Sequence, residues 1–335
     1  MTKILHLTEA GGGVLEVIKN IAEIDKKNQH ILLARKRDFS SNSLDKSMAS
    51  LEVVFWRGNL LKAYLKFLKL NRESHIDIVH FHSSRAGVLR VLFRGIKRVY
   101  SPHCFAFERL DINLLARKFY YAIERLLLHF TDGFLAVNKF ELEWVTHTQL
   151  QIATSRYEYV AERKLRKETE QSLIGIGRIC IQKNPDRFIN IVNALRHETS
   201  NLKVIWIGEG DQELTNKLRE NNIIVTGWLD SERVNAILRS GSMLLHTAKW
   251  EGMPVVFFEA WSIGLPIYAL AANYLEGIAR VNIFNSDTDA VNQILEELTK
   301  RRLNSVYVVD KKRAVSRLNE FYSRVLVNSK VTVSG

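Results

Sequence analysis

The chain has 335 residues, of which 46% are hydrophobic and 25% charged, which suffices for two globular domains with cores of their own. No run of 18 apolar residues and no signal-peptide pattern occurs, which argues against a transmembrane helix. The two widely spaced cysteines fit a reducing cytoplasm and argue against a disulfide framework or a zinc site. The formal net charge is +12, and residues 1–170 carry most of it, with 28 Lys and Arg against 19 Asp and Glu, so this half is expected to face a nucleic acid, a membrane surface or a phosphorylated substrate.

Short apolar runs alternate with longer amphipathic stretches along the chain. In the first half, strands are predicted at 4–8, 30–34, 52–56, 77–82, 98–101 and 133–138, with helical patterns such as 14–24 and 60–70 between them. In the second half, strands are predicted at 172–178, 203–210, 223–227, 242–248 and 266–270. This alternation is typical of an α/β protein with parallel sheets and crossover helices.

The alternation stops near residue 150 and restarts at residue 172. We therefore predict an N-terminal domain at 1–155, a connection without strands at 156–171, a C-terminal domain at 172–310 and a C-terminal helix or tail at 311–335. The expected fold is two doubly wound, Rossmann-like domains that face each other across a cleft. Ligands of such sheets bind at the carboxyl ends of the strands.

A glycine loop follows the first predicted strand, where Gly11, Gly12 and Gly13 precede a helix. Glycines let the backbone approach an anion, and a helix N-terminus offers free N–H groups. A dinucleotide site is disfavoured, because the spacing is not G-x-G-x-x-G and the second strand ends in basic residues instead of an acid. A plain tight turn remains the alternative.

Two histidine-containing segments follow the fourth and fifth strands. His103 comes after a proline at a strand end, a position that is as compatible with catalysis as with a structural role. His80 alternates with apolar strand residues and is expected to be structural.

In the second half, Arg178 and Lys183 follow the strand at 172–178. Two cations at the carboxyl end of one strand form a pocket suited to a diphosphate. The alternative is an ordinary solvated loop.

The stretch WEGMPVVFFEAWSIGLPI places Glu251 and Glu259 eight positions apart. Pro254 suits the first turn of a helix, so Glu251 and Gly252 are expected at the helix mouth. An acid inside an apolar run is costly without a donor, and the two hydroxyls of a ribose would satisfy Glu259. Two unrelated structural glutamates are the alternative.

These residues together resemble the family 4 retaining glycosyltransferases of the GT-B fold, in particular bacterial enzymes of O-antigen, capsule and exopolysaccharide assembly. The E-x7-E element is the most specific part of the resemblance. The glycine loop and the segments DIVHFHSSRAGVL, YSPHCFAF, TDGFLAVN, IGRICIQKNPD, VIWIGEGD and TGWLDSERV agree in order.

The resemblance implies a role for each candidate residue. Glu251 and His103 would act at the donor sugar, and Glu259 would bind the ribose. Arg178, Lys183, Gly252 and Met253 would hold the diphosphate, and Gly12 and Gly13 would let the first loop approach the substrates. The family usually works without a divalent metal, so no cofactor is expected.

The chain departs from the family pattern in a few places. Cys104 stands where many relatives have glycine, and His246-Thr247 replaces a proline-serine pair. The segment Asp287-Thr288-Asp289 spells D-x-D, a metal motif of another glycosyltransferase fold, but its position indicates an ordinary helix start.

The sequence thus predicts transfer of a sugar from a nucleoside-diphosphate donor to a saccharide acceptor, with a lipid-linked acceptor and retention implied by the resemblance. A nucleotide-sugar epimerase of the same architecture is the alternative. A nucleic-acid-binding protein is a weaker one, because no motif for it is present.

A basic amphipathic helix at 60–70 indicates binding to an anionic membrane at the inner face of the plasma membrane. Its apolar face is predicted to comprise Leu61, Tyr64, Leu65 and Leu68, and its basic face Lys62, Lys66 and Lys69. Arg90, Arg94, Lys97 and Arg98 add charge nearby. A packed surface helix with a solvated basic side is the alternative.

Overall fold

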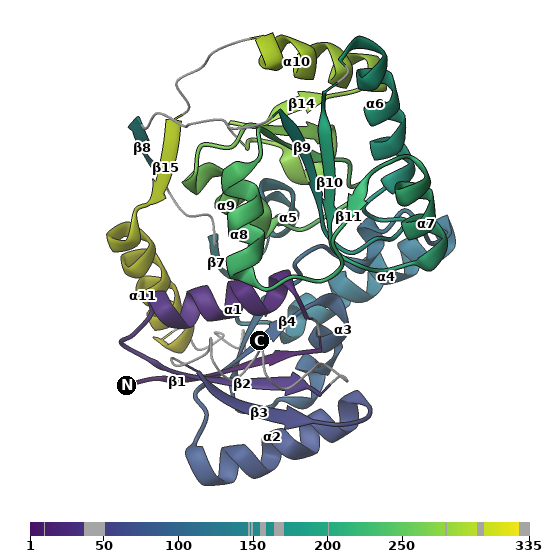
Figure 1. Cartoon of the computed structure of the whole chain (residues 1–335). Coiled ribbons are helices and arrows are strands. Elements are labelled where there is room, and N and C mark those ends of the chain that lie inside the picture. The colour runs from purple at the N-terminus through teal and green to yellow at the C-terminus, as the bar shows by residue number, and fades with distance from the viewer. Residues whose placement is uncertain are drawn as a thin grey trace. The chain divides into compact units, whose positions relative to one another are not determined.

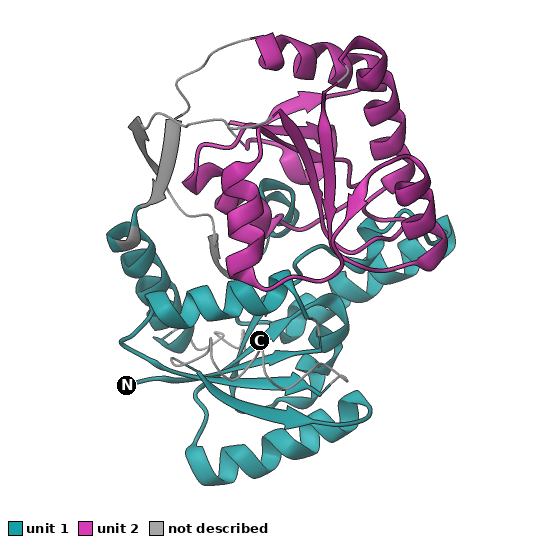
Figure 2. Cartoon of the chain, viewed as in Figure 1, with its two compact units in different colours: residues 1–158, 310–335 teal, residues 159–309 magenta. Residues whose placement is uncertain are grey.

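The computed structural model describes residues 1–9, 11–36, 51–146, 148, 150–154, 159–163, 171–199, 201–278, 280–299 and 305–327. The chain divides into two compact units, which Figure 2 shows in different colours. The first unit comprises Met1–Glu158 together with Asp310–Gly335, and the second comprises Tyr159–Val309. Each unit has a parallel sheet of its own.

The first unit is built on a seven-stranded sheet with the order β3-β2-β1-β4-β5-β6-β7 (Figure 1). Its strands are β1 (Lys3–Thr8), β2 (Gln29–Arg35), β3 (Glu52–Trp56), β4 (Ile78–His82), β5 (Lys97–Ser101), β6 (Gly133–Ala136) and β7 (Gln151–Thr154). Its helices are α1 (Gly13–Ile24), α2 (Leu60–Ser74), α3 (Ser84–Gly87), α4 (Leu114–Leu127), α5 (Lys139–Val145) and α11 (Lys311–Val327), with short 3-10 turns η1 (Val88–Leu92), η2 (Ala106–Glu108) and η3 (Leu128–Phe130).

The second unit has a six-stranded sheet with the order β11-β10-β9-β12-β13-β14. Its strands are β9 (Ser172–Ile176), β10 (Lys203–Ile207), β11 (Ile224–Val225), β12 (Met243–His246), β13 (Ile267–Leu270) and β14 (Asn282–Phe284), and β8 (Tyr159–Arg163) pairs antiparallel with β15 (Ser305–Val309). Its helices are α6 (Pro185–Glu198), α7 (Gln212–Glu220), α8 (Ser231–Ser240), α9 (Val255–Ser262) and α10 (Asp287–Thr299), and η4 (Asn273–Leu275) is a single turn.

The strand order reverses once in each sheet, between β1 and β4 in the first unit and between β9 and β12 in the second. All neighbouring strands within these two sheets run parallel. The doubly wound architecture predicted from the sequence is therefore confirmed for both units. In such sheets, ligands bind outside the carboxyl ends of the strands at the point where the order reverses.

The final helix, α11, belongs to the core of the first unit although the chain reaches it last. Phe321, Tyr322 and Val325 on α11 are buried against apolar side chains of β1, β4, β5 and β6. A Cβ atom on Gly133 would lie 2.6 Å from Val325, so glycine is required at the start of β6 for α11 to pack. Each buried large side chain stabilises this docking by roughly 1.5–3 kcal/mol. Residues 311–327 are thus an integral part of the first unit and not a separate tail.

The predicted strand-free connection between the domains is wrong in one respect. Strands β7 and β8 lie at residues 151–154 and 159–163, within or beside the stretch that was expected to contain no strand. The short β14 was also missed, because three residues with a polar first position give no apolar run. The remainder of the predicted connection lies outside the described residues.

Helix α2 forms at the predicted place, but its predicted apolar face is divided, because Tyr64 and Leu68 are partly buried against the core and the other two residues are not. Ala63, Phe67 and Leu70 face the core, whereas Leu61 and Leu65 are each 56% exposed. The aromatic ring of Phe67 packs 4.3 Å from that of Phe93, measured between ring centroids, and this contact fixes the rotation of the helix. The exposed side of α2 therefore carries leucines as well as lysines.

Two of the arginines assigned to a basic surface are held inside the first unit. Arg90 is fully buried, where it donates to Glu124 at 3.0 Å and lies 3.6 Å above the ring of Tyr100. Arg98 pairs with Asp132 at 3.0 Å. Neither guanidinium is free to meet an external anion. Among the described residues, no helix combines the length and the apolar character needed to cross a bilayer.

Candidate functional site

The loops after β9 and β10 pass so close together that two positions require glycine. Gly177 has a φ of +136° and Gly208 a φ of +138°, which side chains other than glycine rarely adopt. A Cβ atom on Gly208 would lie 2.2 Å from the carbonyl oxygen of Gly177. A Cβ atom on Gly177 would lie 2.5 Å from Cε of Lys183. The lysine stem therefore runs over the bare backbone at the end of β9.

Lys183 forms an ion pair with Glu251 at the point where the second sheet reverses its order. Nζ of Lys183 lies 2.5 Å from Oε1 of Glu251, and the two side chains are only 17% and 16% exposed. The hydroxyl of Thr247 donates to the backbone carbonyl oxygen of Lys183 at 2.8 Å. The side-chain amide of Gln182 donates to the backbone carbonyl oxygen of Trp250 at 2.8 Å. These bonds tie the loop after β9 to the loop after β12. The structure thus brings two of the predicted donor-site residues together.

Helix α9 begins directly after this ion pair. Pro254 is its N-cap, so the helix starts at Val255, and no side chain caps it. Gly252 is buried and Met253 half-buried immediately before the helix. Since the N–H groups of a first helical turn have no partner inside the helix, an anion can bind there. The predicted ribose ligand, Glu259, is half-buried in the second turn of the same helix.

Helices without a side-chain N-cap gather at the reversal points of the sheets. Among the helices whose N-cap is described, α1, α6 and α9 lack one, and these follow β1, β9 and β12. The other such helices are capped by Asn59, Ser83, Asn113, Asn138, Asp211 and Asp230. Because no side chain occupies these helix starts, they are candidate positions for an anion at the strand ends where a ligand is expected.

Arg178, the other cation assigned to the diphosphate, follows Gly177 and is exposed. Within the described ranges it takes part in no ion pair. The structure therefore places Arg178 beside the loop that carries Lys183 but does not join it to Glu251.

The glycine loop of the first unit has the geometry that its sequence suggests. Gly12 is the N-cap of α1, with φ +58° and ψ −127°, a conformation essentially restricted to glycine. Gly13 is the first helical residue, and both glycines are exposed. The amides at the start of α1 are thus open to a ligand.

The segment after β5 holds two consecutive residues in the left-handed region. His103 has a φ of +54° and Cys104 a φ of +93°, although neither is glycine. The carboxylate of Glu141 stabilises this turn, because its Oε1 accepts the N–H of Cys104 and its Oε2 accepts that of Val137, both at 2.9 Å. Burial raises the pKa of Glu141 to about 8. The glycine expected at position 104 from the family pattern thus has a conformational reason.

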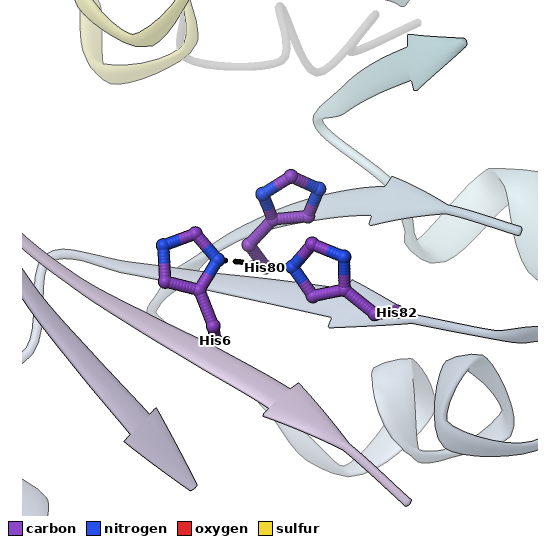
Figure 3. Close-up of side chains that lie close together, drawn as sticks. All are labelled: His6, His80 and His82. Carbon is purple, nitrogen blue, oxygen red and sulfur yellow. Dashed lines mark hydrogen bonds between the residues drawn. The ribbon is translucent and has the colours of Figure 1, made fainter. Parts of the chain in front are cut away.

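Three histidines meet inside the first unit, which the sequence analysis did not anticipate. The ring nitrogens of His6, His80 and His82 include a set within 4.8 Å of one another (Figure 3). His6 and His80 are register partners on β1 and β4, the neighbouring strands at the reversal point. His80 is buried as predicted, and its ring nitrogens lie 3.0 Å from the hydroxyl of Tyr322 and 2.9 Å from that of Ser101.

The histidine cluster is organised by hydrogen bonds and not around a common centre. Nδ1 of His6 lies 2.9 Å from Nε2 of His82, and the second nitrogens of both rings bond to further histidines. Both nitrogens of His80 are also engaged. No lone pair of these rings therefore remains for a metal ion in this arrangement.

The replacement of proline-serine by His246-Thr247 has a structural explanation for one of its two residues. Thr247 supplies the hydroxyl that holds the loop of Lys183. His246 is buried at the end of β12, and within the described part of the chain its Nε2 has no hydrogen-bond partner. Burial, and then the charge of Lys183, lower the pKa of His246 well below its usual value.

The D-x-D segment forms the start of α10, as the sequence predicted. Asp287 pairs with Arg187 at 2.5 Å, and Oδ2 of Asp289 accepts the N–H of Asn285 at 3.0 Å. Both carboxylates therefore stabilise the start of α10, and Asp287 also binds it to Arg187 of α6.

Comparison with known proteins agrees with this arrangement. A family model described as Glycosyltransferase Family 4 matches residues 35–156, and one described as Glycosyl transferases group 1 matches residues 170–300. A Klebsiella pneumoniae protein, described as an uncharacterized 41.2 kDa protein in the cps region, is 25% identical over 98% of this chain and 98% of its own length. The UDP-Gal:alpha-D-GlcNAc-diphosphoundecaprenol alpha-1,3-galactosyltransferase of Escherichia coli is 24% identical over 80% of each chain.

Among solved structures, TarM of S. aureus superposes with a TM-score of 0.73 at 10% identity, over 98% of this chain and 100% of its own. That crystal structure is of a mutant in complex with fondaparinux, alpha-GlcNAc-glycerol and UDP. The two doubly wound units and the likeness to solved structures such as TarM show the GT-B fold. The chain belongs to the glycosyltransferases of the family 4 type.

Proposed function

We propose that this glycosyltransferase takes its sugar from a UDP-sugar, transfers it with retention of anomeric configuration and adds it to a lipid-linked saccharide during assembly of a surface polysaccharide. The observation that carries the donor half is the Lys183–Glu251 ion pair at the mouth of α9. It combines a cation, a carboxylate and a helix N-terminus without a side-chain cap at one edge of the second sheet.

The donor site uses each of these groups for a different part of the ligand. Lys183 and Arg178, with the amides of Gly252 and Met253, neutralise the diphosphate as it leaves. Glu251 holds hydroxyls of the donor sugar, and Glu259 those of the ribose. A carboxylate suits hydroxyl groups because it only accepts hydrogen bonds.

Uridine is supported by the relatives. The Escherichia coli galactosyltransferase is named for UDP-Gal, and TarM was solved with UDP. The lipid-linked acceptor is supported by the diphosphoundecaprenol in the name of the same galactosyltransferase. The position of the K. pneumoniae relative in a cps region fits surface polysaccharide assembly.

We further propose that the first unit binds an anionic membrane surface, where a lipid-linked acceptor would be found. Helix α4 supports this better than α2, because its outward side is strongly apolar: Leu115 is 77% exposed and Phe119 63%. Lys118 and Arg125 are exposed on the same helix. Apolar side chains that insert at the headgroup level, flanked by cations, are typical of interfacial helices.

Donor binding is tested by thermal unfolding in the presence of UDP-, GDP-, ADP- and dTDP-sugars. A ligand that binds only the folded protein raises the unfolding temperature by mass action. We expect a UDP-sugar to raise it and the others to have little effect. Stabilisation by another nucleotide sugar alone would refute the uridine assignment, and epimerisation of the donor without transfer would favour an isomerase.

A further inference from the structure

A continuous line of hydrogen bonds runs through the first unit from the end of α1 to the loop after β5. Nε2 of His103 lies 2.8 Å from Nδ1 of His82, and Nε2 of His82 lies 2.9 Å from Nδ1 of His6. Nε2 of His6 lies 2.9 Å from Nδ1 of His30. At the far end, Nε2 of His30 lies 3.1 Å from the carbonyl oxygen of Asp25 and 3.3 Å from its carboxylate.

Asp25 sets the direction of this line. A backbone carbonyl and a carboxylate can only accept, so Nε2 of His30 must donate to Asp25. A neutral imidazole has one donor and one acceptor nitrogen, so Nδ1 of His30 must accept from His6. The same constraint passes from ring to ring as far as His103, whose Nε2 then donates and whose Nδ1 carries a lone pair.

The surroundings disfavour the charged form of His6, His82 and His103. Asp25, His6, His30 and His82 are all buried. Burial, and then the neighbouring histidines, hold the pKa values of His6 and His82 well below the usual range, and burial lowers the pKa of His103 to about 4.

Other ionisable groups lie beside the line without interrupting it. His80 packs against His6 and His82, and Tyr322 on α11 bonds to His80. Glu141 and Glu108 hold the turn that follows His103 through backbone N–H groups.

The free end of the line is at the carboxyl edge of the sheet. His103 is half-buried, and in the described part of the chain no hydrogen bond is found for its Nδ1. The left-handed backbone at His103 and Cys104 turns the chain sharply at this point. The lone pair of Nδ1 is therefore available to a ligand that brings a hydroxyl donor.

We propose that Asp25 is a positioning residue for His103. Acting through the three intervening histidines, it holds His103 in the tautomer whose Nδ1 accepts a hydrogen bond from a hydroxyl group of the bound sugar. This inference deepens the role at the donor sugar that the family resemblance implies for His103 and rests on the proposed function only for the effect on transfer, because the direction of the line follows from Asp25 together with neutral imidazole rings.

One added proton reverses the line. If His30 becomes an imidazolium beside the Asp25 carboxylate, its Nδ1 donates to Nε2 of His6. His6, His82 and His103 then carry their proton on Nδ1 instead of Nε2, so Nδ1 of His103 becomes a donor. Only N–H bonds form and break, and the net change is one proton taken up from water. A neutral line and a protonated line thus present opposite hydrogen-bonding groups to the ligand.

The tautomers are measured directly by two-bond proton–nitrogen correlation NMR of the full chain labelled with ¹⁵N-histidine, with His103→Gln used to assign the His103 ring. At neutral pH we expect His103, His82, His6 and His30 to carry their proton on Nε2. A proton on Nδ1 of His103 in the unmodified protein would overturn the proposal.

Two variants test the role of Asp25. Asp25→Asn removes the charge that faces His30, but the backbone carbonyl oxygen of residue 25 still accepts from Nε2 of His30 at 3.1 Å, so the preference for one direction of the line is weakened and not abolished. We expect Nδ1 of His103 to become protonated in a measurable fraction of molecules. In His30→Asn, which removes the link to Asp25, we also expect both tautomers of His103 to be populated. An unchanged His103 in both variants would overturn the proposal.

Tyr322→Phe is the matched control, because it removes the hydrogen bond of His80, which lies beside the line but outside it. We expect His103 to be unaffected. An equal change in Tyr322→Phe would show that loosening of the core, and not the line, moves the tautomer.

A transfer assay separates this inference from the proposed function. Asp25→Asn should lower kcat/KM in proportion to the fraction of His103 with its proton on Nδ1, by at most about tenfold, the loss of roughly one hydrogen bond, with UDP affinity unchanged. An altered tautomer with unaltered kcat/KM would establish the line but refute the role of His103 at the sugar.

Discussion

Lys183 and Glu251 form an ion pair at 2.5 Å in the second unit, on loops that follow β9 and β12. A diphosphate that binds at the mouth of α9 competes with Glu251 for the lysine. We expect Lys183→Ala to slow transfer by roughly 10²–10³, the scale of one electrostatic contact in a transition state, and Arg178→Ala to act in the same direction. Steady-state kinetics with the true donor measure both. Unchanged kinetics in both variants would show that the diphosphate binds elsewhere.

The lysine variant needs a control for the carboxylate that it leaves unpaired. Glu251 is largely buried, so Lys183→Ala also costs stability. Removing both charges in Lys183→Ala with Glu251→Gln should restore the unfolding temperature but not kcat. Lys217→Ala is a matched surface control, because Lys217 pairs with Glu213 in an exposed position, and it should leave kcat unaltered.

Transfer should survive removal of divalent metal ions. Asp287 and Asp289, the residues of the D-x-D segment, are engaged by Arg187 and by the backbone of Asn285. We therefore expect full activity in EDTA. An absolute requirement for Mg²⁺ or Mn²⁺ that disappears with Asp287→Ala would instead make this segment a metal site.

Cys104→Gly should stabilise the protein. A side chain at a φ of +93° is strained, whereas glycine adopts this conformation without cost, so the variant should gain about 1 kcal/mol in the free energy of unfolding. Urea unfolding measures the change, and Cys104→Ala, which keeps the Cβ atom, should show no such gain. Equal stability of the glycine and alanine variants would mean that the turn is relaxed as it stands.

The sequence predicted the central strands because strands that are buried on both faces read as short apolar runs. HILLA and DIVHFH lie in β2 and β4 within one residue of the predicted bounds. Strands β7 and β14 have four and three residues, too few for a pattern of their own, and they form because a neighbouring strand presents an unpaired edge.

The histidine line could not be predicted from spacing. His6, His30 and His82 have no common local pattern, and they meet only because β2, β1 and β4 are neighbours in the sheet. The buried side of α2 could not be predicted for a related reason. Leu61 and Leu65 satisfy helical spacing as well as Ala63 and Phe67 do, and only the packing of Phe67 against Phe93 decides between the two faces.

Five histidines whose pKa values are lowered by burial should make the protein less stable in mild acid. Burial lowers the pKa of His103 from 6.5 to about 4 and those of His6, His80, His82 and His246 also fall below the usual value. Between pH 6.5 and 4 these five residues thus bind more protons in the unfolded chain than in the folded one, so their contribution to stability is lost as pH falls. Each such proton adds about 1.4 kcal/mol per pH unit to the slope.

Urea unfolding between pH 7 and 5 measures this slope. His80→Gln should make it shallower by up to one proton, because the glutamine does not titrate. His197→Gln, at an exposed position on α6, should leave it unaltered. A slope that is the same in both variants would show that His80 binds its proton equally in the folded and unfolded states.

Binding to anionic vesicles should depend on the apolar side of α4. Leu115 and Phe119 are the most exposed apolar side chains of that helix, and each contributes roughly 1.5 kcal/mol or more when removed from water. We expect the protein to sediment with anionic vesicles at low salt and to be released at high salt, since each basic residue near the leaflet contributes about 1 kcal/mol.

Two sets of variants test this attachment. Leu115→Ser with Phe119→Ser should lower the partition coefficient at least tenfold, and replacement of Lys62, Lys66 and Lys69 by Glu should also reduce binding. Turnover of a soluble acceptor should stay unchanged in each. Ile224→Ser, at a 52% exposed position in the less basic second unit, is the matched control and should sediment normally. Equal sedimentation with neutral vesicles, or none at low salt, would exclude this electrostatic attachment.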